Sequence, residues 1–143
     1  MLKLGFDEKL SSRLSSGYTV TSTSLAEPGL EIFLAANSEY FVEFLGALNT
    51  TLTSGSNLGL YYTGAFTTDN DSVIVLRPST VLGVLPISAS GYIEDSTPEG
   101  VFHFAGSVRT STSGRLYVKV AKRNGADDDF SLLVGSCLVA RRL

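Results

Sequence analysis

The residues that could do chemistry in this 143-residue chain are few, and their types limit the reactions available. The sequence contains a single histidine, His103, and a single cysteine, Cys137. A hydrolase triad needs a histidine beside a serine and an acid, and a cupin metal site needs several histidines. His103 stands between Phe102 and Phe104, so we expect a packing role for it rather than catalysis. The sequence therefore predicts a protein that is not an enzyme and uses no cofactor.

Cys137 and the glycines add no reactive site. The neighbours of Cys137 are apolar, which favours a small buried side chain over a nucleophilic thiol. One cysteine excludes an internal disulfide bond. The sequence contains no glycine-rich phosphate-binding motif and no pair of metal-ligating cysteines.

Two acidic clusters remain as candidates for ion binding, at residues 69–71 and residues 127–129. Calcium takes about six to eight oxygen ligands, which clustered carboxylates can supply. The candidate calcium ligands are Asp69, Asp71, Asp127 and Asp129. The same residue types are common in hairpin loops because they suit turn geometry. We therefore expect no metal, with calcium as the alternative.

Composition excludes several classes of partner. Charged residues make up 17% of the chain and the formal net charge is −3, with Lys and Arg scattered along the sequence, so we expect no nucleic-acid binding. No stretch approaches the ~20 apolar residues of a membrane span. Asp7, Glu8 and Lys9 interrupt the first apolar residues, so we expect no secretion signal. We therefore expect the protein to be made in a cytoplasm.

The elements that position these residues are predicted to be β-strands from Gly17 onward. We expect strands over residues 18–24, 31–35, 39–49, 58–66, 72–77, 81–85, 88–93, 100–112, 115–123 and 131–143. Their spacing is typical of a sandwich, and no connection is long enough for a parallel crossover. The sequence predicts an all-β fold, an antiparallel two-sheet jelly-roll sandwich over residues 17–143 with a short N-terminal arm.

The predicted arm covers residues 1–16. Apolar residues recur there every four positions, close to a helical repeat, although several serines weaken a helix. We expect an arm, helical or irregular, that lies against a partner; a helix packed on its own domain is the alternative. The candidate anchoring residues are Leu2, Leu4, Phe6, Leu10 and Leu14.

Several predicted strands are apolar on both faces, whereas a sandwich strand normally turns one polar face to water. If these strands share one sheet, its second apolar face exceeds what a monomer usually exposes, and a closed homo-oligomer would bury it. We expect Glu43 and His103, which fall on this face, to approach one another near the oligomer axis. The alternative is a monomer with a Ser/Thr-rich surface. The predicted interface residues are Phe41, Leu45, Tyr61, His103, Leu133, Cys137 and Val139.

Three segments resemble known proteins. Gly114–Ala121, Gly135–Leu143 and the aromatic run Tyr40–Phe44 are similar to compact β-domains of tailed-phage virion proteins. More broadly, residues 30–143 resemble the trimeric jelly rolls of the tumour necrosis factor and C1q-like class. The chain departs from the C1q pattern because it has no Gly-X-Y stalk.

The resemblance implies a structural protein on the surface of a phage capsid, made in the host cytoplasm. It implies a head decoration or cement protein that binds the major capsid protein as a homotrimer. The alternative is the receptor-binding tip of a tail fibre or spike, which would recognise a host glycan or protein with side chains such as Tyr61 and Tyr92. A cupin-like enzyme is a third interpretation and would require bound metal.

Overall fold

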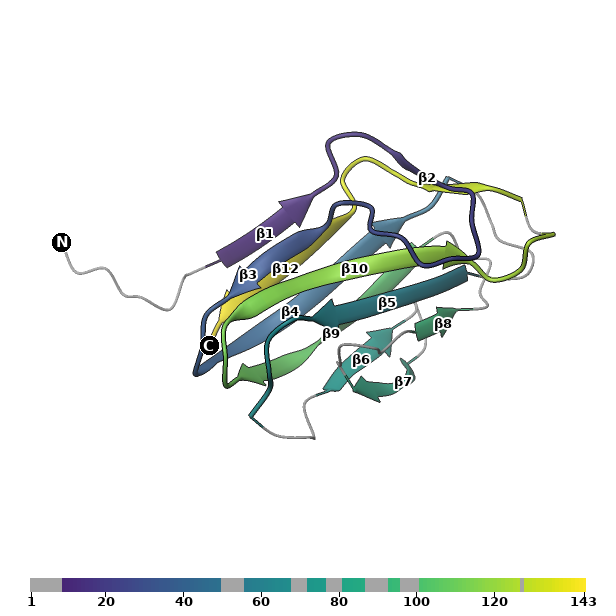
Figure 1. The fold of residues 1–143 in the computed structure, drawn as a ribbon. Coiled ribbons are helices and arrows are strands. Elements are labelled where there is room, and N and C mark those ends of the chain that lie inside the picture. The colour runs from purple at the N-terminus through teal and green to yellow at the C-terminus, as the bar shows by residue number, and fades with distance from the viewer. Residues whose placement is uncertain are drawn as a thin grey trace.

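The computed structural model describes residues 9–49, 56–67, 72–76, 81–86, 93–95, 101–126 and 128–143. These residues form twelve β-strands and contain no helix (Figure 1). All pairings between the strands are antiparallel. The predicted all-β antiparallel sandwich is therefore confirmed. No helix long and apolar enough to cross a bilayer occurs in this part of the chain.

The larger sheet has six strands in the order β1-β12-β4-β9-β6-β7. Its longest pairing joins β4 to β9 over ten residues, and β12 pairs along the other side of β4. In chain order the strands are β1 (Lys9–Arg13), β4 (Ser38–Ala47), β6 (Ser72–Leu76), β7 (Val81–Pro86), β9 (Val101–Thr110) and β12 (Cys137–Arg142).

The second sheet has four strands in the order β3-β10-β5-β8, and a separate pair joins β11 to β2. The four-stranded sheet faces the six-stranded sheet (Figure 1). Its strands are β3 (Glu31–Leu34), β5 (Ser56–Tyr62), β8 (Ile93–Asp95) and β10 (Gly114–Lys122). The short pair consists of β2 (Tyr18–Val20) and β11 (Phe130–Leu132).

Alternating apolar side chains from both sheets form one core. In β4 the side chains of Tyr40, Val42 and Phe44 point inward and are almost completely buried. The Phe44 ring packs on Phe104 of β9, with 5.0 Å between the ring centroids. Opposite them, β10 contributes Leu116, Val118 and Val120, which are at most 1% exposed. The period of two in these strands thus fixes which face of each sheet is buried.

The end of the chain forms two strands rather than the single predicted one. Residues 133–136 separate β11 from β12, and Gly135 has a φ of +95°, in the left-handed region that glycine adopts readily. In one continuous strand, alternation would place Val134 on the same side as Leu132 and Leu138, but Val134 lies in this break and is exposed. Leu132, Leu138 and Ala140 are buried as their alternation predicts.

The N-terminal arm also requires a correction. A helical or irregular segment is wrong for residues 9–13, because they form β1 and pair with β12 along its whole length. Leu10 packs against the core and Leu14 is only 7% exposed within it. These two candidate anchors are therefore already used by their own domain. Leu2, Leu4 and Phe6 lie outside the described residues.

Candidate functional site

The outer face of the six-stranded sheet is apolar at its centre. Phe41 and Leu45 of β4 are 40% and 46% exposed, and Cys137 and Val139 of β12 are half-buried beside them. The register places Cys137 opposite Leu45 and Val139 opposite Glu43. We call the surface formed by Phe41, Leu45, Cys137 and Val139 the apolar sheet face. It lies on the side of β4 and β12 opposite the core, so the sheet is apolar on both sides as predicted.

The side chains of His103 and Glu43 are joined by a hydrogen bond on the same surface. His103 of β9 lies opposite Leu45, and its Nε2 is 3.0 Å from Oε2 of Glu43. The two side chains are 32% and 47% exposed. The expected approach of Glu43 and His103 is confirmed within one chain, and their position near an oligomer axis stays a prediction.

Leu133 lies at the end of this surface rather than within a strand. Its backbone N–H donates a hydrogen bond of 2.8 Å to the carbonyl oxygen of Ala47, the last residue of β4. The neighbouring Leu132 pairs with Leu48, and both of these side chains are buried. The partly exposed Leu133 therefore follows the outward alternation of β4 and extends the apolar sheet face.

Tyr61, also a predicted interface residue, does not lie on the apolar sheet face. It belongs to β5 in the four-stranded sheet, and it is only 6% exposed. Alternation along the strand predicted an outward side chain, but alternation does not say to which sheet a strand belongs. The prediction that Tyr61 shares a surface with Phe41 and Leu45 is therefore wrong.

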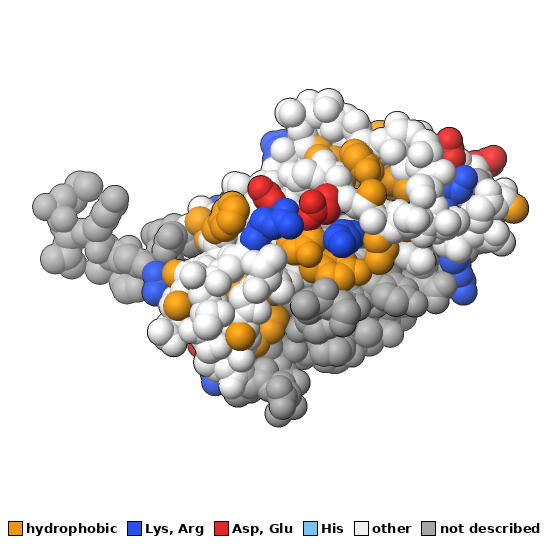
Figure 2. Space-filling model, in the orientation of Figure 1, with side chains coloured by type: hydrophobic (Ala, Val, Ile, Leu, Met, Phe, Trp, Pro, Cys, Tyr) orange, Lys and Arg blue, Asp and Glu red, His pale blue; other side chains and the backbone are white. Residues whose placement is uncertain are grey.

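Tyr61 instead helps to form an aromatic and charged surface on the outside of the four-stranded sheet. Its ring stacks on that of Tyr117 with 5.6 Å between centroids. The Lys119 Nζ lies 5.1 Å and 5.8 Å from these two ring centroids, and the Arg115 guanidinium lies 4.0 Å from that of Tyr117. We call Tyr61, Tyr117, Arg115, Lys119 and the neighbouring Phe33 the tyrosine face. Figure 2 views it and shows charged side chains gathered beside hydrophobic ones.

Gly59 allows the Tyr61 ring to lie along the sheet. A Cβ atom at this position would come within 2.9 Å of three atoms of the Tyr61 side chain. The ring therefore occupies the space left by the missing side chain, beside Lys119 on the neighbouring strand. Sequence analysis missed this surface, although the alternation of Arg115, Tyr117 and Lys119 in β10 was the signal for it.

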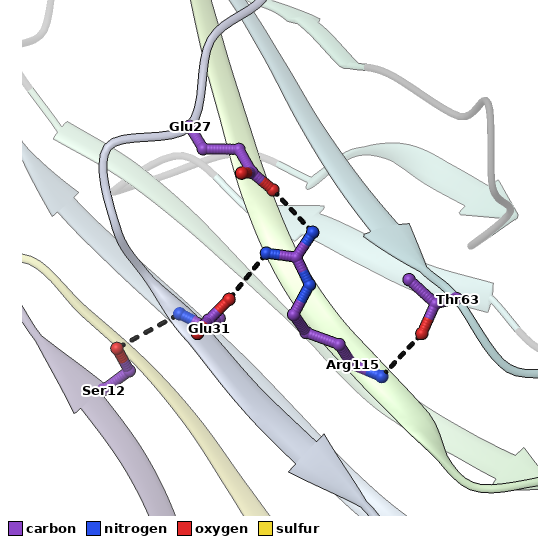
Figure 3. A network of polar contacts seen from close by, with 5 residues as sticks. All are labelled: Ser12, Glu27, Glu31, Thr63 and Arg115. Atoms are coloured by element: carbon purple, nitrogen blue, oxygen red, sulfur yellow. Dashed lines mark hydrogen bonds and ion pairs between the residues drawn. The ribbon is translucent and has the colours of Figure 1, made fainter.

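Arg115 joins the tyrosine face to the edges of both sheets (Figure 3). Its guanidinium donates to Glu31 at 2.6 Å and lies 2.9 Å from a Glu27 oxygen. The hydrogen bond with Glu31 is the main reason why the pKa of Arg115 lies above its usual value, and Glu27 adds to the effect. Across the sandwich edge, the Glu31 backbone N–H donates to the Ser12 hydroxyl of β1. The backbone N–H of Arg115 donates to Thr63.

The calcium candidates are not gathered into a site in the described part of the chain. Asp69, Asp71 and Asp127 lie outside the described residues. Asp129 accepts a hydrogen bond of 3.0 Å from the buried ammonium of Lys122, which competes with any cation for that carboxylate. No group of three or more His, Cys, Asp or Glu side chains able to hold a metal occurs among the residues that the structure describes.

No protein-family model matches the chain, and no curated protein matches it. Among solved structures, the Eiger TNF of S. frugiperda aligns with a TM-score of 0.51 and 13% identity, over 94% of this chain and 91% of that one.

Viral structures align at lower TM-scores. The VP2 subviral particle of infectious bursal disease virus gives 0.40 with 14% identity, over 95% of this chain and 30% of that chain. The baseplate tripod of bacteriophage Tuc2009 gives 0.29 with 11% identity, over the whole of this chain and 69% of that one. The similarity to Eiger TNF shows the fold alone, and the protein is an all-β antiparallel jelly roll.

Proposed function

We propose that this protein is a structural component of a virus particle and acts by forming contacts rather than by catalysis. The apolar sheet face is the observation that carries the proposal. Phe41 and Leu45 are large apolar side chains exposed on a regular sheet, and Leu133, Cys137 and Val139 extend the same surface. Monomeric proteins rarely expose a contiguous apolar surface, so a surface of this kind indicates an interaction site.

The proposed arrangement is a homotrimer that decorates the head of a tailed phage. Burial of the apolar sheet face between copies supplies the free energy of assembly at about 25 cal/mol per Å² of apolar area. Three capsid contacts made together by one trimer would add avidity without any strong single contact. This arrangement is supported by the jelly-roll fold and by the resemblance of the chain's end to phage virion proteins.

The capsid contact itself is assigned to the residues before β1. Leu10 and Leu14 are committed to the domain core, so the proposal keeps Leu2, Leu4 and Phe6 as the residues that bind the major capsid protein. Because β1 is held against β12, it would deliver this segment from a fixed edge of the sandwich.

A second candidate function is the receptor-binding tip of a tail fibre. The tyrosine face favours it, because Tyr117, Arg115 and the 67% exposed Phe33 are residue types common at recognition surfaces. Such a tip would bind a host protein or glycan through this surface.

Copy number in purified particles tests the proposed function. We expect quantitative mass spectrometry to find on the order of hundreds of copies per particle for a decoration protein, because it repeats with the capsid lattice. A few tens of copies or fewer would favour the fibre tip. Absence of the protein from purified particles would contradict both.

A further inference from the structure

The hydrogen bond between His103 and Glu43 lies among apolar side chains of the six-stranded sheet. In the strand register, Leu45 lies directly opposite His103, and Val139 and Ala105 lie on the two sides of Glu43. All five residues alternate with buried residues along β4, β9 and β12, so they share the outer face of the sheet. The pair is therefore part of the surface that self-association would cover.

Few other charged or titratable groups share this surface. In the described chain they are Lys9 and Arg13 on β1, Cys137 and Arg141 on β12, Glu39 on β4 and Arg109 on β9. Glu39 and Arg109 pair with each other at 3.6 Å. On the far side of β9, neither β6 nor β7 contains a titratable residue. His103 and Glu43 are therefore each other's nearest partner for the exchange of charge.

Burial of this surface changes what the Glu43 carboxylate requires. The His103 and Glu43 side chains are 32% and 47% exposed in the single chain, so water solvates the carboxylate whichever form His103 takes. A second copy lying over the surface would remove that water. An unpaired charge is costly in an apolar interface, whereas a charge with an opposite charge beside it is tolerated. The buried carboxylate therefore needs a protonated histidine next to it.

We propose that His103 and Glu43 form a pH-sensitive switch that strengthens self-association as the pH falls. The proposal rests on the self-association in the proposed function and adds its regulation. Histidine ordinarily changes its charge between about pH 5 and 8, and His103 is the single histidine of the chain. With His103 protonated the pair is neutral overall, and with His103 neutral it carries one negative charge. The oligomer therefore binds more protons than the free subunits, and its dissociation constant falls with pH.

The dissociation constant of the wild type at pH 7.5 and pH 5.5 is the first test. Each proton taken up on association lowers the constant by up to about tenfold per pH unit. We expect sedimentation equilibrium to give a constant at least about tenfold lower at pH 5.5 than at pH 7.5. A constant that is unchanged or higher at pH 5.5 would overturn the proposal.

Two substitutions separate the switch from the general loss of net charge on acidification toward the pI near 5.0. His103→Gln keeps a hydrogen-bond donor but does not titrate, so its dissociation constant should change less than about threefold between the two pH values. Glu43→Gln leaves a protonated His103 without a carboxylate, so acid should now weaken association, by about threefold or more. A purely structural contact between the two side chains would not reverse the direction of the pH effect.

Glu39→Gln is the matched control, because it removes a paired carboxylate from the same face of the same strand. It should keep the pH dependence of the wild type. If His103→Gln responds to acid as strongly as the wild type does, or if Glu39→Gln loses the response, the assignment to His103 and Glu43 is overturned.

The outcomes distinguish this inference from the function on which it rests. A wild-type oligomer whose dissociation constant does not depend on pH would overturn the switch and leave the apolar sheet face as the assembly surface, which Val139→Glu tests separately. A wild-type chain that is monomeric at both pH values, while circular dichroism shows that it is folded, would overturn the switch and the self-association together.

Discussion

At the scale of single residues, Tyr62 shows how burial sets both packing and titration. Its side chain is almost completely buried, and the hydroxyl donates a hydrogen bond of 2.6 Å to the carbonyl oxygen of Thr112. Its ring stacks on Phe66 with 4.7 Å between centroids. Burial is the main reason why the pKa of Tyr62 is raised above its usual value of 10.0, and the nearby Tyr40 raises it further. Ionised Tyr62 is therefore disfavoured in the folded chain.

Replacing Tyr62 with Phe should separate these two contributions. At neutral pH we expect a loss of about 1 kcal/mol, because one hydrogen bond disappears while the ring still fits. The raised pKa stabilises the fold fully below about pH 10, and this stabilisation is lost as the pH rises through the folded-state pKa. The wild type should therefore lose stability more steeply than Tyr62→Phe above pH 10.

Urea unfolding at pH 7, 9, 10 and 11 measures this difference. Tyr117→Phe is a matched control on the outer side of β10, outside the core cluster. Parallel curves of stability against pH for the wild type and Tyr62→Phe would contradict the assignment of the alkaline transition to Tyr62.

At the scale of elements, the sequence predicted most strands but not how the ends of the chain are used. Apolar residues four positions apart fit a helix, yet four is also a multiple of the strand period of two. Leu10 and Leu14 therefore share the inner face of an extended segment, and Ser12 between them binds the Glu31 backbone. Alternation alone cannot decide between these structures, because the deciding contact is the pairing of β1 with β12.

Two further differences between the predicted and the observed strands arise because alternation does not specify where a strand ends or with which strand it pairs. The break around Gly135 removes four residues from the last strand, an even number, so Leu132 and Leu138 both still point inward. The predicted burial of Leu132 and Leu138 is therefore confirmed, although the predicted single strand over residues 131–143 is wrong. Tyr61 was assigned to the wrong sheet because strand order depends on pairings between residues far apart in the chain.

Truncation of the N-terminal region tests the role of β1. We expect removal of residues 1–16 to destabilise the domain by at least about 2 kcal/mol more than removal of residues 1–8. The longer deletion removes the buried Leu14 and the whole β1–β12 pairing, and it exposes core side chains beneath them. Equal midpoints for the two truncated proteins in denaturant titrations would contradict a structural role for β1.

At the scale of the whole molecule, the two faces of the six-stranded sheet differ: the inner face packs in the core, and the outer face carries the proposed assembly surface. Adjacent residues in β12 divide between them: Leu138 is fully buried in the core, whereas Val139 points outward beside Glu43. Sequence alternation predicted this division correctly. Alternation does not specify what the outer face contacts, because the pattern of a single strand carries no information about a second molecule.

This division makes Leu138 and Val139 a matched pair for testing assembly. We expect Val139→Glu to place a carboxylate in the proposed interface next to Glu43, where repulsion and desolvation oppose association, and to yield folded subunits of 15.2 kDa. Leu138→Ala should instead leave a cavity in the core and cost about 2–5 kcal/mol of folding stability. Sedimentation and thermal unfolding of both variants distinguish the two effects. If Val139→Glu keeps the oligomer of the wild type, the apolar sheet face is not its assembly surface.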